Sequence, residues 1–308
     1  MNLPPNPKIR FYKVRTFSEK MNVTFDFLRE NLKPLLKFSF YVILPLCLVQ
    51  SFSMDSFMRG YMGLITGEGN GFPFVMGYYG LLMLCNVMGF VLLSALVYSL
   101  LQVYERRDRR LQGLAFADFK EPFLKGCIKV LRILFFAFGV IIAVWVVIML
   151  FALMSSWTLA LTIPLTLVGL LAVMIPFALF TPLYLFEDLP FADALRKSMK
   201  YGFSAWGETF LVLLVFGLLA NIIGGVTTLP WMLVTIFGSV FSEISPDASV
   251  TSSFWYRFLT YLLGVIMAYG TYVSEMISVG GIAFQYFHLR EKKDGVTLKT
   301  DITNFDRL

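Results

Sequence analysis

Residues 133–154 read ILFFAFGVIIAVWVVIMLFALM and contain no charged side chain. A helix of roughly 20 apolar residues is long enough to cross the hydrocarbon core of a bilayer. Hydrophobic residues make up 57% of the 308 positions and charged residues 15%, against about 25% charged residues in soluble domains. We therefore predict an all-α polytopic membrane bundle of six transmembrane helices with cytoplasmic amphipathic helices. The predicted spans are residues 35–58, 74–104, 127–154, 157–186, 208–241 and 254–287.

The distribution of basic residues predicts the orientation of these spans. Lys and Arg accumulate on the cytoplasmic side of a membrane. Of the 26 basic residues, 24 fall in the N-terminal segment, in the second and fourth connections with their flanks, or in the C-terminal tail, and the exceptions are Arg59 and Arg257. We therefore expect a multi-pass protein of the bacterial cytoplasmic (inner) membrane with both termini cytoplasmic. Its predicted parts are an N-terminal segment (1–34), a transmembrane domain (35–287) and a cytoplasmic tail (288–308).

The segment before the first span, residues 16–34, predicts an amphipathic helix. Its apolar residues recur every three or four positions and form one stripe, which comprises Phe17, Met21, Phe25, Leu28 and Leu32. Thr16 and Glu19 have the spacing of a capping box, in which each side chain satisfies the other residue's amide. We expect this helix to lie in the headgroup layer or against the bundle, and binding of a partner protein is the alternative.

Two later segments begin in a similar way and suggest an internal repeat. Residues 115–136 and 190–214 each run from an acid-tipped start into a span. In the three segments Asp26, Asp118 and Asp193 occupy comparable places, each seven residues before a lysine. We predict three repeats of an amphipathic helix followed by a transmembrane hairpin.

An acidic residue, Glu275, interrupts the sixth span within YGTYVSEMISVGG (269–281). Charged residues at membrane depth are costly and usually functional. Asn86 and Asn221 lie at middling depth in other spans. In one interpretation Glu275 is protonated and donates a hydrogen bond to Asn221 or Asn86, which joins the helices. In the other it lines a cavity and binds a proton, a cation or a lipid amine.

Three further features concern sites. Glu187 and Asp188 precede the third amphipathic segment, where they could cap the helix and pair with Arg196 or Lys197, or bind a cation. The three cysteines are isolated and show no metal-ligand spacing, so we expect no metal. Three prolines in the fourth span, Pro164, Pro176 and Pro182, predict a bent or broken helix.

Two stretches resemble a known family. They are FTPLYLFEDLPFADALRKSMKYGFSAW (180–206) and QYFHLREKKDGVTLKTDI (285–302). Both resemble segments of the membrane domain that is attached to some glycerophosphoryl diester phosphodiesterases, and of its relatives. The resemblance implies a six-span membrane domain and does not carry the phosphodiesterase activity, because that activity needs a barrel of about 250 residues and 21 residues follow Phe287.

Catalytic signatures are missing from the sequence. It has no Gly-rich phosphate loop, no G-x-S-x-G elbow and no H-E-x-x-H motif. The single histidine, His288, is expected to be an interfacial residue at the membrane edge. We therefore expect a non-enzymatic accessory, scaffold or lipid-interacting subunit without a cofactor. Its expected partners are membrane lipids and proteins of a membrane complex, and not nucleic acid. The alternative is a transporter or permease for a lipid or amphiphile, with Glu275 in an intramembrane cavity.

Overall fold

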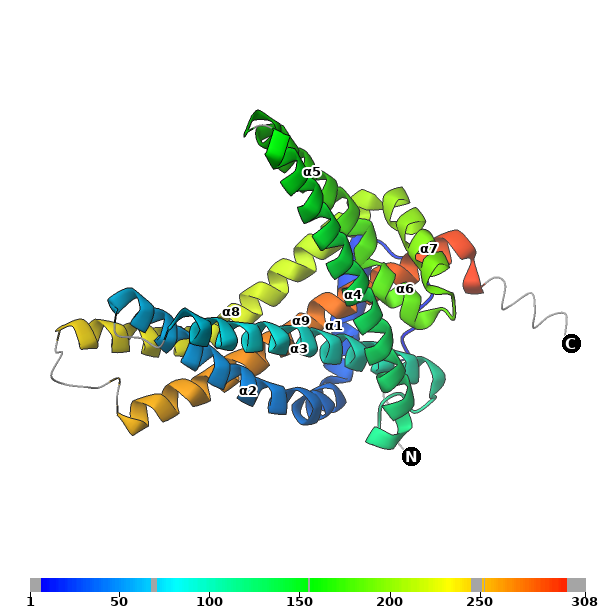
Figure 1. Cartoon of the computed structure of the whole chain (residues 1–308). Helices are drawn as coiled ribbons and strands as arrows, with labels where there is room; N and C mark the ends of the chain where they lie inside the picture. Colours follow the sequence, from blue (N-terminus) through cyan, green and yellow to red (C-terminus); the bar gives the residue numbers. More distant parts are fainter. Residues whose placement is uncertain (1–6, 68–70, 155, 245–250, 252, 298–308) are drawn as a thin grey trace, which may run out of the picture. The chain divides into compact units, whose positions relative to one another are not determined.

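The structure is a computed structural model that describes residues 7–67, 71–154, 156–244, 251 and 253–297 (Figure 1). In these residues the regular secondary structure is helical and no strand occurs. The prediction of an all-α protein is therefore confirmed. The helices are α1 (Phe17–Glu30), α2 (Leu32–Thr66), α3 (Phe72–Arg106), α4 (Phe116–Met154), α5 (Ser156–Ala178), α6 (Phe180–Phe186), α7 (Phe191–Ser204), α8 (Trp206–Ile244) and α9 (Phe254–Asp294).

Six helical segments are long and apolar enough to cross a membrane, as predicted. They are Leu32–Ile65, Phe72–Arg106, Phe116–Leu153, Ala160–Phe186, Trp206–Phe241 and Phe254–Asp294. Several helices extend beyond the predicted spans. In particular, α4 starts well before residue 127, and α9 continues past residue 287 into a charged stretch. The chain is therefore a multi-pass membrane protein whose spanning helices continue into more polar regions.

The fourth span is broken, as its prolines predict. Helix α5 ends at Ala178 and α6 begins at Phe180, with Leu179 between them. The Leu179 amide donates to the Pro176 carbonyl at 3.2 Å, which is a tighter turn than an α-helix makes. Proline lacks the amide hydrogen that an α-helix needs and clashes with the preceding turn. The two prolines that flank Leu179, Pro176 and Pro182, thus account for the break.

The chain forms two compact units, which we describe separately. The basic unit comprises residues 1–31, 97–216 and 279–308, and the apolar unit comprises residues 32–96 and 217–278. The names follow from the sequence, because the apolar unit contains four basic residues (Lys33, Lys37, Arg59 and Arg257) and the basic unit contains all others. This division differs from the linear one that the sequence suggests, since α3, α8 and α9 each contribute to both units.

Helix α1 has the predicted capping box but does not bury its apolar stripe. The Thr16 amide donates to the Glu19 carboxylate at 2.7 Å, and the Glu19 amide donates to the Thr16 hydroxyl at 3.4 Å. The buried residues of α1 are instead Lys20, Thr24 and Phe27. They face α9 within the basic unit: Lys20 Nζ donates to Gln285 Oε1 at 2.8 Å, and a Cβ at Gly280 would lie 3.3 Å from Thr24.

The predicted repeat is only partly present. The third amphipathic segment is a separate helix, α7, whereas the second is continuous with the span of α4. Asp118 and Asp193 lie in the first turns of their helices. Asp26 lies in the second half of α1, and the acid in the first turn there is Glu19. The equivalence of Asp26 with the other two aspartates was therefore wrong.

In the apolar unit, α8 and α9 approach closely at small residues. A Cβ at Gly224 would lie 2.9 Å from the Ser274 hydroxyl, and one at Gly270 would lie 2.5 Å from the Thr227 hydroxyl. Small residues let membrane helices pack closely. Helices α8 and α9 thus pack small residue against small residue.

Candidate functional sites

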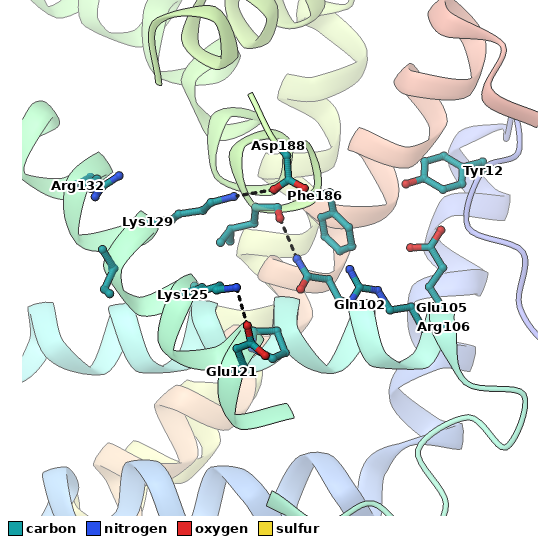
Figure 2. A pocket seen from close by; sticks show the side chains of 14 residues that line it. Tyr12, Gln102, Glu105, Arg106, Glu121, Lys125, Lys129, Arg132, Phe186 and Asp188 are labelled. Atoms are coloured by element: carbon teal, nitrogen blue, oxygen red, sulfur yellow. Dashed lines mark hydrogen bonds and ion pairs between the residues drawn. The ribbon is translucent and has the colours of Figure 1, made fainter. Parts of the chain in front are cut away.

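A cavity of about 610 Å³ opens in the basic unit among the end of α3, the first half of α4 and α6 (Figure 2). Its charged and polar lining residues are Tyr12, Gln102, Glu105, Arg106, Glu121, Lys125, Lys129, Arg132 and Asp188. Apolar groups from Pro122, Ile128, Leu185 and Phe186 complete the wall. The cavity thus combines cationic side chains with an apolar surface.

One wall of the cavity is a basic face of α4. Lys125, Lys129 and Arg132 are spaced four and three residues apart, so they project from the same side of the helix. Lys129 Nζ donates to the Tyr184 carbonyl at 2.9 Å and lies 3.8 Å from the Asp188 carboxylate. The Lys125 ammonium pairs with the Glu121 carboxylate at 2.6 Å. The contact from the Arg132 guanidinium goes to the neutral Tyr184 hydroxyl at 3.4 Å.

The opposite wall comes from the end of α3 and the N-terminal segment. Gln102 Nε2 donates to the Leu185 carbonyl at 2.8 Å, which fixes α6 against α3. Arg106 is exposed at the last position of α3. The Tyr12 hydroxyl accepts a hydrogen bond from Arg290 at 2.8 Å. Burial and the nearby Glu105 carboxylate raise the pKa of Tyr12 to about 12, so the phenol keeps its proton at neutral pH and can donate it.

The basic side chains of the cavity are not all neutralised. Lys125 and Lys129 have carboxylate partners. Neither Arg106 nor Arg132 takes part in an ion pair within the part of the chain that the structure describes. The two guanidinium groups therefore remain available to an anion that enters the cavity.

The structure separates the two acids Glu187 and Asp188. The Glu187 carboxylate is buried and contacts Lys197 at 2.8 Å, and it accepts from the Tyr286 hydroxyl at 3.0 Å. Asp188 is exposed and faces the cavity. The predicted pairing with Lys197 is confirmed, whereas the N-cap position of α7 is Pro190 and carries no side-chain hydrogen bond. Among the described residues no group of three or more His, Cys, Asp or Glu side chains could hold a metal ion.

Lys197 bridges two carboxylates at the end of α9. Its ammonium lies 2.8 Å from both Glu187 and Asp294. Burial by itself would lower the pKa of Lys197, but the hydrogen bonds to Asp294 and Glu187 outweigh it and raise the pKa above its usual value. Lys197 is therefore charged at neutral pH and ties α7 to α6 and α9.

His288 is buried within the basic unit. Its side chain is 4% exposed. The backbone amide of Arg15 donates to Nδ1 at 2.9 Å, and Nε2 lies 3.3 Å from the Glu208 carboxylate. The N-terminal segment therefore covers this face of α9, and the expectation that His288 lies at the membrane edge stays a prediction.

A second candidate site is a groove of about 340 Å³ between α8 and α9 in the apolar unit. Its polar lining residues are Asn221, Thr228, Thr271, Ser274 and Glu275, next to Gly224 and Gly225. Two of the three predicted intramembrane candidates, Glu275 and Asn221, thus share one groove. Neither is fully buried.

The third candidate, Asn86, does not line this groove. Its amide donates to the Leu82 carbonyl at 2.8 Å and accepts from Gln50 at 3.4 Å. The Asn221 amide donates to the Gly217 carbonyl in its own helix at 2.8 Å, and Glu275 hydrogen-bonds with Ser278 one turn further along α9. A hydrogen bond from Glu275 to either asparagine, as one interpretation required, is not among the contacts of the described residues.

Sequence reasoning singled out two residues of the groove, Glu275 and Asn221, but missed the cavity. The basic residues of the cavity served only to predict orientation, and the spacing of Lys125, Lys129 and Arg132 on one helix face was the available signal. The other wall comes from segments distant in sequence. Comparison of the chain with protein-family models, curated proteins and solved structures finds no match, so the two sites are the basis for a functional proposal.

Proposed function

We propose that this protein is a non-enzymatic integral membrane protein of the bacterial inner membrane that binds anionic lipid headgroups on its cytoplasmic side. In this role it acts as an accessory or scaffold subunit of a membrane complex. The observation that carries the proposal is the cavity of the basic unit, where Arg106 and Arg132 lie beside an apolar wall and have no carboxylate partner among the described residues.

The chemistry of the cavity suits a phospholipid headgroup. A guanidinium group offers a planar set of donors that matches the oxygens of a phosphate. Basic residues near the cytoplasmic leaflet gain roughly 1 kcal/mol each from anionic lipids. The apolar groups of Ile128 and Phe186 can contact the glycerol and the upper acyl chain. With the basic unit at the cytoplasmic surface, the cationic side chains would meet the lipid phosphate, and the apolar wall would meet the apolar part of the lipid.

The exposed stripe of α1 supports the same location. Phe25 is 38% exposed, although it is a large apolar residue. The docking face of α1 is already occupied by α9 through Lys20 and Phe27. A helix that is held by one face and presents a second, apolar face is suited to lie in the headgroup layer. We propose that α1 anchors the basic unit to the cytoplasmic leaflet.

The test is lipid-dependent stabilisation of the purified protein. Phosphatidylglycerol added to neutral-detergent micelles should raise the melting temperature more than phosphatidylcholine does. The double variant Arg106→Gln, Arg132→Gln should abolish this difference, because hydrogen bonds to charged groups contribute about 1.5–3 kcal/mol each. Arg196→Gln is the matched control, since the Arg196 side chain is 84% exposed and lies outside the cavity. Equal stabilisation of the wild type by the two lipids would contradict the proposal.

The accessory role has its own test. Affinity purification from native membranes in mild detergent should yield partner proteins in constant proportion, together with bound anionic lipid. We also propose, from the two resembling stretches and the six spans, that the chain is a relative of the membrane domain attached to some phosphodiesterases.

A transporter for a lipid or amphiphile is the second candidate. The observation that favours it is the groove that reaches Glu275 from the surface of the apolar unit. Transport should then require an ionisable group, so Glu275→Gln should abolish function and leave folding intact. Equal function in the wild type and the variant would exclude this candidate.

A further inference from the structure

We infer that the groove between α8 and α9 binds an amphiphile whose head is a primary ammonium group, held at the depth of Glu275. This inference depends on the proposed membrane location of the apolar unit but not on the headgroup cavity of the basic unit. It follows from the hydrogen-bonding groups of the groove, which are nearly all acceptors.

Three hydroxyl groups that line the groove already donate their hydrogens to backbone carbonyls. Thr228 donates to the Gly224 carbonyl at 3.0 Å, Thr271 to the Met267 carbonyl at 2.9 Å, and Ser274 to the Thr271 carbonyl at 2.8 Å. A carbonyl oxygen cannot donate, so each of these bonds must use the single hydroxyl hydrogen. The lone pairs of the three hydroxyl oxygens remain, and these can only accept.

The amide and the acid extend this pattern. Asn221 Nδ2 donates to the Gly217 carbonyl at 2.8 Å, which fixes the orientation of the amide and leaves Oδ1 as an acceptor. Glu275 contributes a carboxyl group, whose ionised form is acceptor-only. A ligand that fills the groove must therefore bring donors, and an ammonium group supplies three of them.

Charge selects the ammonium over a neutral donor. Glu275 is the only ionisable residue that lines the groove, and the described lining contains no basic residue. An ionised carboxylate at membrane depth is costly unless it is paired. A ligand ammonium would supply the missing charge partner in a groove lined by these acceptors, whereas a hydroxyl would not neutralise the charge.

The rim of the groove suits the rest of an amphiphile. Leu229 and Met232 line it and are 52% and 47% exposed, so they present apolar surface beside the polar floor. The glycines Gly224 and Gly225 lack side chains that would fill the floor. An alkyl chain can therefore lie along the rim while its head reaches Glu275.

The experiment uses the full chain in neutral-detergent micelles and a photoreactive hexadecylamine with a diazirine in its alkyl chain. Cross-linked peptides are identified by mass spectrometry. We expect labelling of α8 and α9 beside the groove, competed by unlabelled hexadecylamine and not by hexadecanoic acid of the same chain length. Glu275→Gln, which keeps the shape of the side chain and removes its charge, should weaken competition at least about tenfold. Asp55→Asn, an acid of the apolar unit outside the groove, should have no effect.

Two outcomes would overturn the inference. Equal competition by the amine and the fatty acid would show that the groove is only an apolar surface. Unchanged competition in Glu275→Gln would show that the acid does not meet the ammonium. If Glu275→Gln has a lowered melting temperature, Thr228→Val tests the same point, because it removes one acceptor and should weaken competition without touching the acid.

The result is separable from the test of the headgroup cavity. Glu275→Gln should retain the extra stabilisation by phosphatidylglycerol, and the double arginine variant should retain amine labelling. Loss of only one of the two responses identifies which site was wrongly assigned.

Discussion

Replacement of Gly202 by alanine tests how the broken fourth span is held. Gly202 lies on α7 and is buried against α5, where a Cβ would overlap the Cα and Cβ atoms of Pro176. Backbone atoms cannot move aside as a flexible side chain can, so α7 and α5 must separate. The same contact includes a hydrogen bond from the buried Ser198 hydroxyl to the Pro176 carbonyl at 2.9 Å.

The expected change in the free energy of unfolding follows from these contacts. Overpacking of a filled site costs about 1–3 kcal/mol, and the strained hydrogen bond adds about 1 kcal/mol. The higher helix propensity of alanine offsets up to about 1 kcal/mol of this destabilisation. We therefore expect Gly202→Ala to lower the free energy of unfolding by about 1–4 kcal/mol.

The matched control is Gly207→Ala in the first turn of α8, where a Cβ would have no neighbour within 4 Å. This variant should be as stable as the wild type or more stable by up to about 1 kcal/mol. The assay is unfolding in mixed micelles with a rising fraction of sodium dodecyl sulfate, followed by circular dichroism. If Gly202→Ala proves as stable as Gly207→Ala, the contact between α7 and α5 is not as close as the structure has it.

Three further predictions concern topology, the anchor helix and an ion pair. A reporter fused at residue 195 should report the cytoplasm and one at residue 247 the opposite side, and a reversed result at 195 would contradict the six-span topology. Replacing Phe25 and Leu28 by serine should speed proteolysis of the N-terminal segment in inverted vesicles, because the apolar stripe of α1 would no longer bind the lipid. An unchanged rate of proteolysis would refute the proposal that α1 is an anchor. Lys197→Met should cost about 1–3 kcal/mol through lost charged hydrogen bonds. The pKa of Lys197 is raised on folding, so its contribution is complete below the usual lysine value and is lost as the pH rises through the higher folded value. The stability gap to the wild type, measured by the same micelle titration, should therefore narrow above about pH 10.4, and a gap independent of pH would contradict the ion pair.

Hydropathy and proline placement predicted much of the fold because both act locally. An uncharged run such as residues 133–154 has no stable alternative to a helix in lipid. The break beside Pro176 follows from the chemistry of a single residue. The ends of α4 and α9 were less predictable, since these helices continue beyond the apolar run and are supported there by contacts with other segments.

Side-chain contacts between distant segments were the part that could not be predicted. On α1 the apolar stripe was expected to face either the headgroup layer or the bundle, because lipid offers apolar side chains an environment as good as the bundle does. The protein contact instead uses Lys20 and Thr24, because α9 presents Gln285 and Gly280 to them. The groove was partly predicted because an acid in an apolar run is conspicuous in the sequence. The cavity depends on which helix ends meet, and no local pattern encodes that.

Helix α4 has a consequence for how this protein can change over evolutionary time. Only 6% of its most apolar stretch of 18 residues is buried within the described structure. The first half of the helix, in contrast, buries Phe119, Phe123, Val130 and Ile133. Exchange among leucine, isoleucine, valine and phenylalanine in the exposed half leaves insertion into lipid unchanged, and most of the side chains there are exposed. Random drift should therefore be fast in residues 137–153 and slow in residues 119–133. One helix would accumulate substitutions at two rates, with the slower half marking the part that the fold depends on.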